Sequence, residues 1–148
     1  MSRVIFIGRT GSGKTTLCQK LNEMEIKYKK TQAVEVYDNA IDTPGEYLEN
    51  RHFFNSLLQT SVDARLIAIL ADPTVDLNYI PPAFTGTFAK EVIGIITKAC
   101  LVTDEKKIAR VRDELRGAGI QKIFLVDTVE GFGIDELFSY IHEKIDGR

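Results

Sequence analysis

The sequence predicts an α/β fold in which a mostly parallel sheet of about five strands lies between helices. Short apolar runs alternate with amphipathic helical patterns along the 148 residues, which is typical of βαβ units. Four of the five runs are continuously apolar, as strands covered on both faces are expected to be. A glycine-rich turn joins the first run to the first helical pattern. Together with the chain length, these observations predict one three-layer α/β domain over residues 1–148.

The expected strands are the five apolar runs, at residues 4–7, 33–42, 65–71, 92–96 and 122–126. Helical patterns fill the gaps, at residues 15–23, 47–59, 104–116 and 134–145. The last helical pattern has the clearest apolar stripe, which we expect to pack against the sheet. Gly117 offers a C-terminal stop for the helix at 104–116.

The composition excludes several classes of protein. Apolar residues make up 44% of the chain and charged residues 27%, which is ordinary globular usage. The formal net charge of −2 argues against a broad nucleic-acid-binding face. No segment approaches the ~20 apolar residues that a membrane span needs. Cys18 and Cys100 fit free thiols in a reducing compartment, so the expected location is the cytoplasm.

The turn after the first expected strand fits the phosphate-loop motif G-x-x-x-x-G-K-[ST] at every position. Its residues are Gly8, Arg9, Thr10, Gly11, Ser12, Gly13, Lys14 and Thr15. Successive backbone N–H groups in such a loop form a concave anion nest, and the helix N-terminus adds its positive dipole end. Lys14 supplies a charge for the β- and γ-phosphates, the Thr15 hydroxyl suits Mg²⁺, and Thr16 adds a donor at the α-phosphate. The motif therefore predicts the three-layer fold of the P-loop NTPases.

A second group of residues follows the second expected strand. Asp42 ends that strand, where an aspartate assists Mg²⁺ in P-loop enzymes, and the Gly45 N–H is expected to reach a γ-phosphate. Glu46 is either a base for an attacking water or a solvated carboxylate at a helix start. Thr31 falls between the first helical pattern and this strand, and is either a further Mg²⁺ ligand or an ordinary loop residue.

Several of these segments occur in a familiar order. The phosphate loop, Thr31, Asp42-Thr43-Pro44-Gly45 and Thr97-Lys98 resemble the motifs of the P-loop GTPases of the translation-factor and small-G-protein superclass. More narrowly, the chain resembles the EutP/PduV family, named for ethanolamine and propanediol utilisation, over essentially its whole length. The segments that carry this narrower resemblance are Gly8–Leu17, Lys30–Glu35, Ile41–Tyr47 and Pro81–Phe84. The family is associated with bacterial microcompartments that process short aldehydes.

The resemblance implies binding of ATP or GTP with Mg²⁺ by the phosphate loop, helped by Thr16, Gly45, Thr97 and Lys98. It implies Thr15 and Asp42 as metal ligands, favours Thr31 as a third, and leaves Lys14 and Glu46 as the candidate catalytic residues. A microcompartment shell or lumen enzyme becomes a candidate partner, with neither nucleic acid nor membrane expected.

The chain departs from the GTPase pattern in three places. The guanine-reading motif [NT]-K-x-D reads Thr97-Lys98-Ala99-Cys100, and a thiol does not replace the paired acceptors of a carboxylate. The loss of this carboxylate is expected to weaken discrimination between guanine and other bases by about one or two orders of magnitude. The late Ser-Ala motif reads Asp127-Thr128, whose acidic residue is expected to crowd or repel guanine. Only ten residues separate Thr31 from Asp42, which leaves little room for an extra hairpin strand.

Three functions stay open at the level of the sequence. One is an NTP-hydrolysing switch, in which γ-phosphate contacts order the Thr31 and Gly45 loops. Another is a small-molecule kinase that passes the γ-phosphoryl group to an acetate-type acceptor, an activity associated with members of the resembled family. The third is a nucleotide-clipped accessory module that docks to a microcompartment or enzyme partner. A Mg²⁺-bound nucleotide is common to all three.

Overall fold

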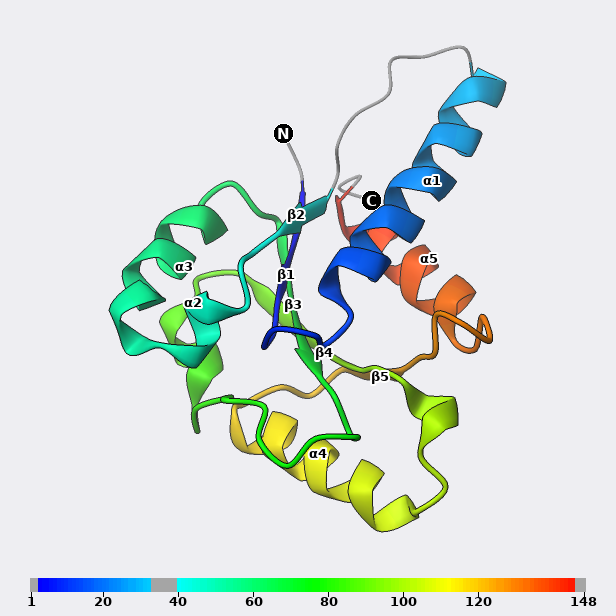
Figure 1. Cartoon of the computed structure of the whole chain (residues 1–148). Coiled ribbons are helices and arrows are strands. Elements are labelled where there is room, and N and C mark those ends of the chain that lie inside the picture. The colour runs from blue at the N-terminus through cyan, green and yellow to red at the C-terminus, as the bar shows by residue number, and fades with distance from the viewer. Residues whose placement is uncertain (1–2, 33–39, 146–148) are drawn as a thin grey trace.

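The computed structural model describes residues 3–32 and 40–145. At its centre is a five-stranded parallel sheet with the strand order β2-β1-β3-β4-β5. The strands are β1 (Val4–Ile7), β2 (Ala40–Asp42), β3 (Leu66–Ala71), β4 (Glu91–Ile96) and β5 (Ile123–Leu125). Helices cover both faces of the sheet, so the molecule has three layers (Figure 1). The predicted parallel sheet between helices is confirmed.

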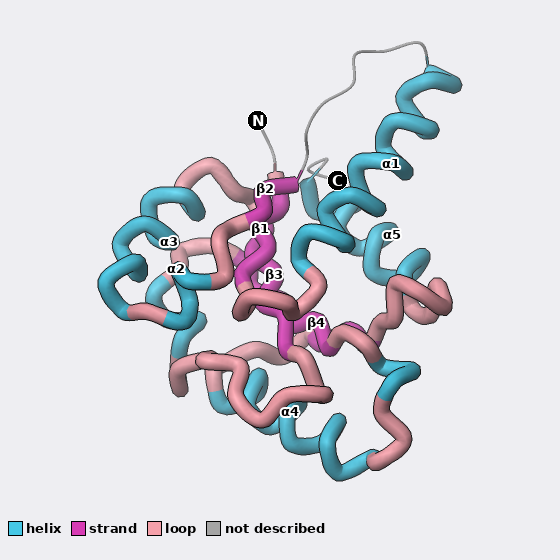
Figure 2. The backbone as a smooth tube through the Cα atoms, in the orientation of Figure 1, coloured by secondary structure: helices cyan, strands magenta, loops and turns pink. Residues whose placement is uncertain are grey.

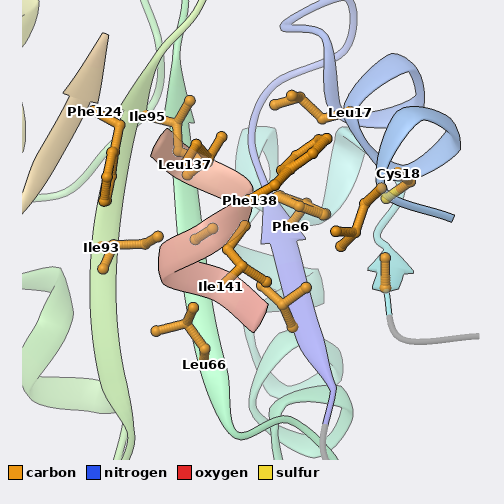
Figure 3. Packing of buried hydrophobic residues seen from close by; sticks show 14 of the residues in the cluster. Phe6, Leu17, Cys18, Leu66, Ile93, Ile95, Phe124, Leu137, Phe138 and Ile141 are labelled. Atoms are coloured by element: carbon orange, nitrogen blue, oxygen red, sulfur yellow. The ribbon is translucent and has the colours of Figure 1, made fainter. Parts of the chain in front are cut away.

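Helices α1 (Lys14–Gln32) and α5 (Ile134–Ile145) cover one face of the sheet. The apolar stripe of α5 packs there as predicted, with Leu137, Phe138 and Ile141 lying over the strands (Figure 3). Leu17, Cys18 and Leu21 bring the first half of α1 into the same cluster. This face therefore ties the helix that follows the phosphate loop to the C-terminal helix.

The other face is covered by α2 (Glu46–Glu49), α3 (Phe54–Ser61) and α4 (Glu105–Gly117), which lie across the sheet from α1 and α5 (Figure 2). Three short 3₁₀ helices, η1 (Arg51–Phe53), η2 (Phe84–Thr87) and η3 (Ala99–Leu101), complete the fold. Strand β1 shows how the sheet serves both layers, because Val4 and Phe6 enter one cluster while Ile5 and Ile7 enter the other. This two-sided burial explains the continuously apolar runs.

Helix α1 is longer than predicted. It runs from Lys14 to Gln32, whereas the sequence pattern places its end near residue 23. The apolar stripe fades after Leu21, but no glycine or proline interrupts the remaining residues, so the backbone continues as a helix. The backbone of Thr31 consequently belongs to the last turn of α1 and not to a loop. The first part of the predicted strand at 33–42 lies outside the described residues, and β2 covers its last three.

One further helix differs from the expectation, and one helix end agrees with it. The single helix predicted at 47–59 is broken into α2, η1 and α3. Asn50 explains the break, because its side-chain oxygen accepts a hydrogen bond from the His52 N–H at 3.0 Å and competes with helical bonding. Helix α4 ends at Gly117, where the sequence predicts its C-terminal stop, although Gly117 does not have a left-handed φ. That conformation falls on Gly119, with a φ of 99°.

The parallel arrangement brings the carboxyl ends of all the strands to one edge of the sheet. The phosphate loop follows β1 at this edge, Asp42 ends β2, and Asp72, Thr97 and Asp127 come shortly after β3, β4 and β5. β1 lies between β2 and β3, so the direction of strand order reverses beside the phosphate loop. Crevices at such switch points are the usual ligand sites of open α/β sheets. Within the described ranges, no helix combines the length and the apolar character that a membrane crossing requires.

Candidate functional site

The phosphate loop has the conformation that its glycines permit. Gly11 and Gly13 have φ values of 81° and 109°, a region that side-chain-bearing residues rarely adopt. The first hydrogen bond of α1 runs from the Leu17 N–H to the Gly13 carbonyl at 3.1 Å. The amides of Lys14, Thr15 and Thr16 precede that bond and have no acceptor within the helix. These donors, with the positive end of a long helix, form an anion-binding surface.

The side chains of Arg9 and Ser12 face protein rather than the nest. Ser12 is fully buried, and its Oγ has no hydrogen-bond partner among the described residues. A Cβ on Gly8 would lie 2.6 Å from that Oγ, so only glycine fits there. Arg9 turns away from the nest, donating from its guanidinium to the Leu77 carbonyl at 2.7 Å.

Lys14 lies at the centre of the site and is 6% exposed. Its Nζ donates to the Arg9 carbonyl at 3.0 Å, so the ammonium folds back over the loop. Burial lowers the pKa of Lys14, and the nearby carboxylates of Asp42 and Glu49 partly oppose that change. A bound polyphosphate would supply the compensating charge that this half-desolvated ammonium lacks.

Two of the three predicted metal ligands, Thr15 and Asp42, are in contact. The Thr15 hydroxyl donates to the Asp42 carboxylate at 2.5 Å, although the residues come from different strand ends. Thr43 fixes the end of β2, because its N–H and its hydroxyl both donate to the Phe6 carbonyl, at 3.4 and 2.9 Å. One hydroxyl and one carboxylate oxygen therefore lie side by side at the edge of the anion nest.

Gly45 lies directly against the phosphate loop. A Cβ added to Gly45 would come within 2.3 Å of the Thr10 nitrogen, so the approach of the two backbones requires glycine. Thr10 in turn donates to the Glu49 carboxylate from its N–H at 2.8 Å and from its hydroxyl at 2.7 Å. Glu49 was not among the site residues that the sequence predicts, because a glutamate inside a helical pattern carries no local signal.

Thr97 and Lys98 brace the phosphate loop from the end of β4. The buried Thr97 hydroxyl donates to the Ser12 carbonyl at 2.8 Å. Lys98, which has a left-handed φ of 56°, donates from its Nζ to the Gly11 carbonyl at 2.8 Å and forms a 2.6 Å ion pair with Asp72. Asp72 is not among the site residues that the sequence predicts, although an acidic residue directly after a buried strand is a usable signal.

The Asp127 side chain, which the sequence predicts to crowd or repel a guanine base, is oriented differently from that expectation. It is held inward by the N–H groups of Val129 and Glu130 on one oxygen, at 3.0 and 3.1 Å, and by the Cys100 N–H on the other, at 3.0 Å. The carboxylate, 3% exposed, therefore shapes the loop after β5. Burial raises the pKa of the Cys100 thiol, and the negative charges of Asp127 and Glu130 add to this. The thiol stays protonated at neutral pH.

Two cavities share the phosphate loop. The larger, of about 470 Å³, runs from the nest toward the β4 and β5 loops. Its lining includes Gly11–Thr16, Thr97, Lys98, Cys100, Leu101 and residues 127–130. The smaller, of about 340 Å³, is lined by Thr10, Gly11, Lys14, Thr15 and Asp42–Gly45. Because Gly11, Lys14 and Thr15 line both, the cavities adjoin as one elongated site with the nest at its middle.

Two of the predicted site residues, Thr31 and Glu46, are described by their backbone alone. The backbone of Thr31 lies sixteen residues after Thr15 along α1, which corresponds to about 24 Å of helix. Glu46 begins α2 directly after Gly45, so its backbone adjoins the smaller cavity. The side chains of both residues lie outside what the structure describes.

Comparison with known proteins agrees with this geometry. The model of a family described as ethanolamine utilisation - propanediol utilisation, PduV-EutP, matches residues 1–143. The chain is 38% identical over 144 residues to propanediol utilization protein PduV of Citrobacter freundii, covering 97% of this chain and 95% of the relative. It is 44% identical over 145 residues to the probable acetate kinase EutP of Salmonella typhimurium, covering 95% and 89%.

Solved structures show a related fold at lower identity. Era in complex with MgGDPNP and 16S ribosomal RNA superposes with a TM-score of 0.63 at 18% identity, covering 97% of this chain and 56% of that one. A bacterial selenocysteine-specific elongation factor gives a TM-score of 0.65 at 21% identity, covering 100% of this chain and 29% of that one. The fold is thus that of the GTPase-like P-loop proteins. On the family match and the identities to its relatives, this chain belongs to the PduV-EutP family of ethanolamine and propanediol utilisation.

Proposed function

We propose that this chain binds a nucleoside triphosphate with Mg²⁺ in the elongated site and cleaves its terminal phosphate bond. The observation that carries this proposal is the 2.5 Å contact between the Thr15 hydroxyl and the Asp42 carboxylate, beside the amides of a phosphate loop. A loop alone would suit any anion. The additional pair of hard oxygen ligands favours a polyphosphate that arrives with a divalent cation.

The residues present suit Mg²⁺ held jointly with the nucleotide. Among the described residues, no group of three or more His, Cys, Asp and Glu side chains could hold a metal unaided. Mg²⁺ is commonly bound through one or two protein oxygens plus substrate phosphates, which matches Thr15 and Asp42. When bound, the ion would neutralise charge that develops on the phosphates. Thr31 is proposed as a third ligand only for a state in which the end of α1 is remodelled.

The phosphate chain is proposed to follow the loop. The amides of Lys14, Thr15 and Thr16 face its α- and β-phosphates, and Lys14 releases the Arg9 carbonyl to reach the β- and γ-phosphates. The Gly45 N–H, which has no hydrogen-bond acceptor within the described residues, meets the γ-phosphate in the smaller cavity. Glu46 is the candidate base for an attacking water because it directly follows Gly45.

The larger cavity is proposed to hold the base with little discrimination between ATP and GTP. The position that reads guanine in GTPases carries the Cys100 thiol, which does not offer paired acceptors. The nearest buried carboxylate, that of Asp127, is already used by three backbone N–H groups. The exposed apolar side chains of Leu101 and Val129, at 70% and 89% exposure, offer contact to the ring of any purine.

A second candidate reaction is transfer of the phosphoryl group to a small carboxylate. The observation that favours it is the similarity to two EutP proteins that are described as probable acetate kinases. In this reaction an acetate oxygen forms a bond to the γ-phosphorus while the bond to the β–γ bridging oxygen breaks. The nucleoside diphosphate keeps that electron pair, and the product is acetyl phosphate.

One experiment separates these reactions. The protein is incubated with Mg·ATP, with and without acetate, and inorganic phosphate and acetyl phosphate are both quantified. Phosphate release that is independent of acetate supports hydrolysis, whereas acetyl phosphate formed in step with ADP supports the kinase. Tight binding with neither product would overturn both reactions and favour an accessory module that uses the nucleotide as a structural clip in ethanolamine or propanediol utilisation.

A further inference from the structure

Helix α2 is tied to the phosphate loop by one side chain. The Glu49 carboxylate accepts hydrogen bonds from both the N–H and the hydroxyl of Thr10, at 2.8 and 2.7 Å, on the same Oε2 atom. The two residues are 39 positions apart in sequence, so this contact sets the relative position of two segments. These bonds, together with the charges of Arg9 and Lys14, hold the pKa of Glu49 below its usual value.

The hydrogen bonds between Glu49 and Thr10 also fix the position of Gly45. Gly45 precedes α2, and its carbonyl accepts the N–H groups of Leu48 and Glu49 at 3.1 and 3.3 Å. Glu49 is therefore linked to Gly45 through the helix and to Thr10 through its carboxylate. Between these links, the Gly45 backbone is pressed against Thr10, with no room for a Cβ. Gly45, whose N–H has no acceptor among the described residues, is thus held at the wall of the smaller cavity, which Lys14 also lines.

We infer that Glu49 and Thr10 are a positioning pair that presets the Gly45 amide for a γ-phosphate and so gives the site its preference for triphosphate over diphosphate. This inference rests on the proposed function. A diphosphate ends near Lys14 and does not need Gly45, whereas a triphosphate gains one further backbone donor. Because the donor is already in place, binding of the triphosphate does not include the entropy cost of ordering α2.

The opposite reading is that the Glu49 charge merely repels the γ-phosphate. The hydrogen bonds argue against it, because the bonded oxygen is already engaged by two donors of the loop. Glu49→Ala removes the acceptor and the charge together, whereas Glu49→Gln removes the charge and keeps an acceptor oxygen for Thr10. Thr10→Val removes the hydroxyl donor and keeps the N–H, with little change in side-chain size. The variants therefore separate positioning from repulsion.

The test measures dissociation constants calorimetrically for ADP and for a non-hydrolysable β,γ-imido ATP analogue, both with Mg²⁺. In Glu49→Ala we expect the analogue to bind about three- to tenfold more weakly and ADP to bind within about twofold of wild type. Glu49→Gln should keep most of the preference for triphosphate. Thr10→Val should weaken analogue binding in the wild-type background and have little further effect in Glu49→Ala, because both changes break one contact.

Glu143→Gln supplies the matched control, since it removes a glutamate charge from the last turn of α5, and Glu143 lines neither of the two cavities that share the phosphate loop. It should leave both constants unchanged. Thermal unfolding of each variant reports whether the whole domain has lost stability; such a general loss would weaken ADP and analogue alike and would overturn the inference. An unchanged ratio in Glu49→Ala, or tighter analogue binding in Glu49→Gln, would also overturn it. A wild-type chain that binds neither nucleotide would instead overturn the proposed function itself.

Discussion

The Thr15 hydroxyl and the Asp42 carboxylate are 2.5 Å apart, which joins the loop after β1 to the end of β2. Parallel pairing of β1 with β2 accounts for this contact, because Phe6 and Asp42 are register partners. Two oxygens are thus brought to the mouth of the anion nest before any ligand is bound. The first prediction follows from this pair.

Asp42→Asn should weaken nucleotide binding only when Mg²⁺ is present. The amide keeps the side-chain shape and removes the charge that attracts the cation, so we expect about a tenfold loss of affinity for Mg·ATP. Binding of ATP in EDTA should change little. Fluorescence titration with a labelled ATP analogue at several Mg²⁺ concentrations measures both quantities. An equal loss with and without Mg²⁺ would show that Asp42 serves the fold and not the metal.

Nucleotide binding should depend on pH through Lys14. Burial lowers the Lys14 pKa in the free protein from 10.5, and bound phosphates are expected to raise it, since an adjacent anion favours the charged form. Between the two pKa values, binding takes up a proton. Affinity should therefore be constant at lower pH and fall by about tenfold per pH unit within that window.

Calorimetry in buffers of different ionisation enthalpy detects this proton uptake directly at alkaline pH. Lys14→Met, which keeps an unbranched side chain without the charge, should abolish the uptake. Uptake that persists in Lys14→Met would assign the titration to another group.

Asp72→Asn should destabilise the fold by about 2 kcal/mol at neutral pH. The Asp72 side chain is 2% exposed and accepts from Lys98 and Thr74, so the amide would leave a poorly paired ammonium beside the phosphate loop. Burial raises the Asp72 pKa, but those hydrogen bonds outweigh it, and the pKa lies below 3.8. The stabilisation is thus present above 3.8 and is lost as the pH falls through the folded-state pKa.

Urea unfolding of wild type and Asp72→Asn across this pH range tests the assignment. Asp76→Asn is the matched control, because Asp76 lies in the same segment with a fully exposed side chain 3.5 Å from Arg110. It should change stability by less than about 0.5 kcal/mol. Equal effects of the two substitutions would contradict the assigned role of Asp72.

Cys100→Asp should shift the preference of the site toward GTP by about tenfold or more. A carboxylate at this position would supply the paired acceptors that the thiol lacks, although the charges of Asp127 and Glu130 reduce the gain. Cys100→Ser, which is similar in size and neutral, should leave the ATP to GTP ratio unchanged. Competition between the two nucleotides for one labelled analogue gives the ratio directly. A marked GTP preference of the wild-type chain would contradict the interpretation of Cys100.

Much of the fold and the centre of the site could be predicted from the sequence. Strands β1 and β3 are covered on both faces, so burial leaves continuous apolar runs, and the phosphate loop needs glycines at fixed positions because Gly11 and Gly13 are left-handed. The apolar stripe of α5 could likewise be predicted from the spacing of its residues. These features share a local cause, since each is set by the residues of one segment.

What could not be predicted depends on individual side-chain hydrogen bonds, most of which join different segments. The break before η1 follows from the hydrogen bond that the Asn50 side chain accepts from the His52 N–H. This bond competes with helical hydrogen bonding in a segment whose residues otherwise favour a helix. The inward turn of Asp127 depends on three N–H groups from two loops. The Glu49–Thr10 tie joins segments 39 residues apart. No periodicity or motif encodes such pairs.

The most direct test of the central claim is calorimetric titration of the chain with ATP, GTP and their diphosphates in the presence of Mg²⁺, beside Lys14→Ala. We expect saturable binding of ATP and GTP with similar affinities in the wild type, and a loss of about tenfold or more in the variant, because the ammonium faces the β- and γ-phosphates. Binding that is equal in wild type and Lys14→Ala, or no binding of either triphosphate, would contradict it.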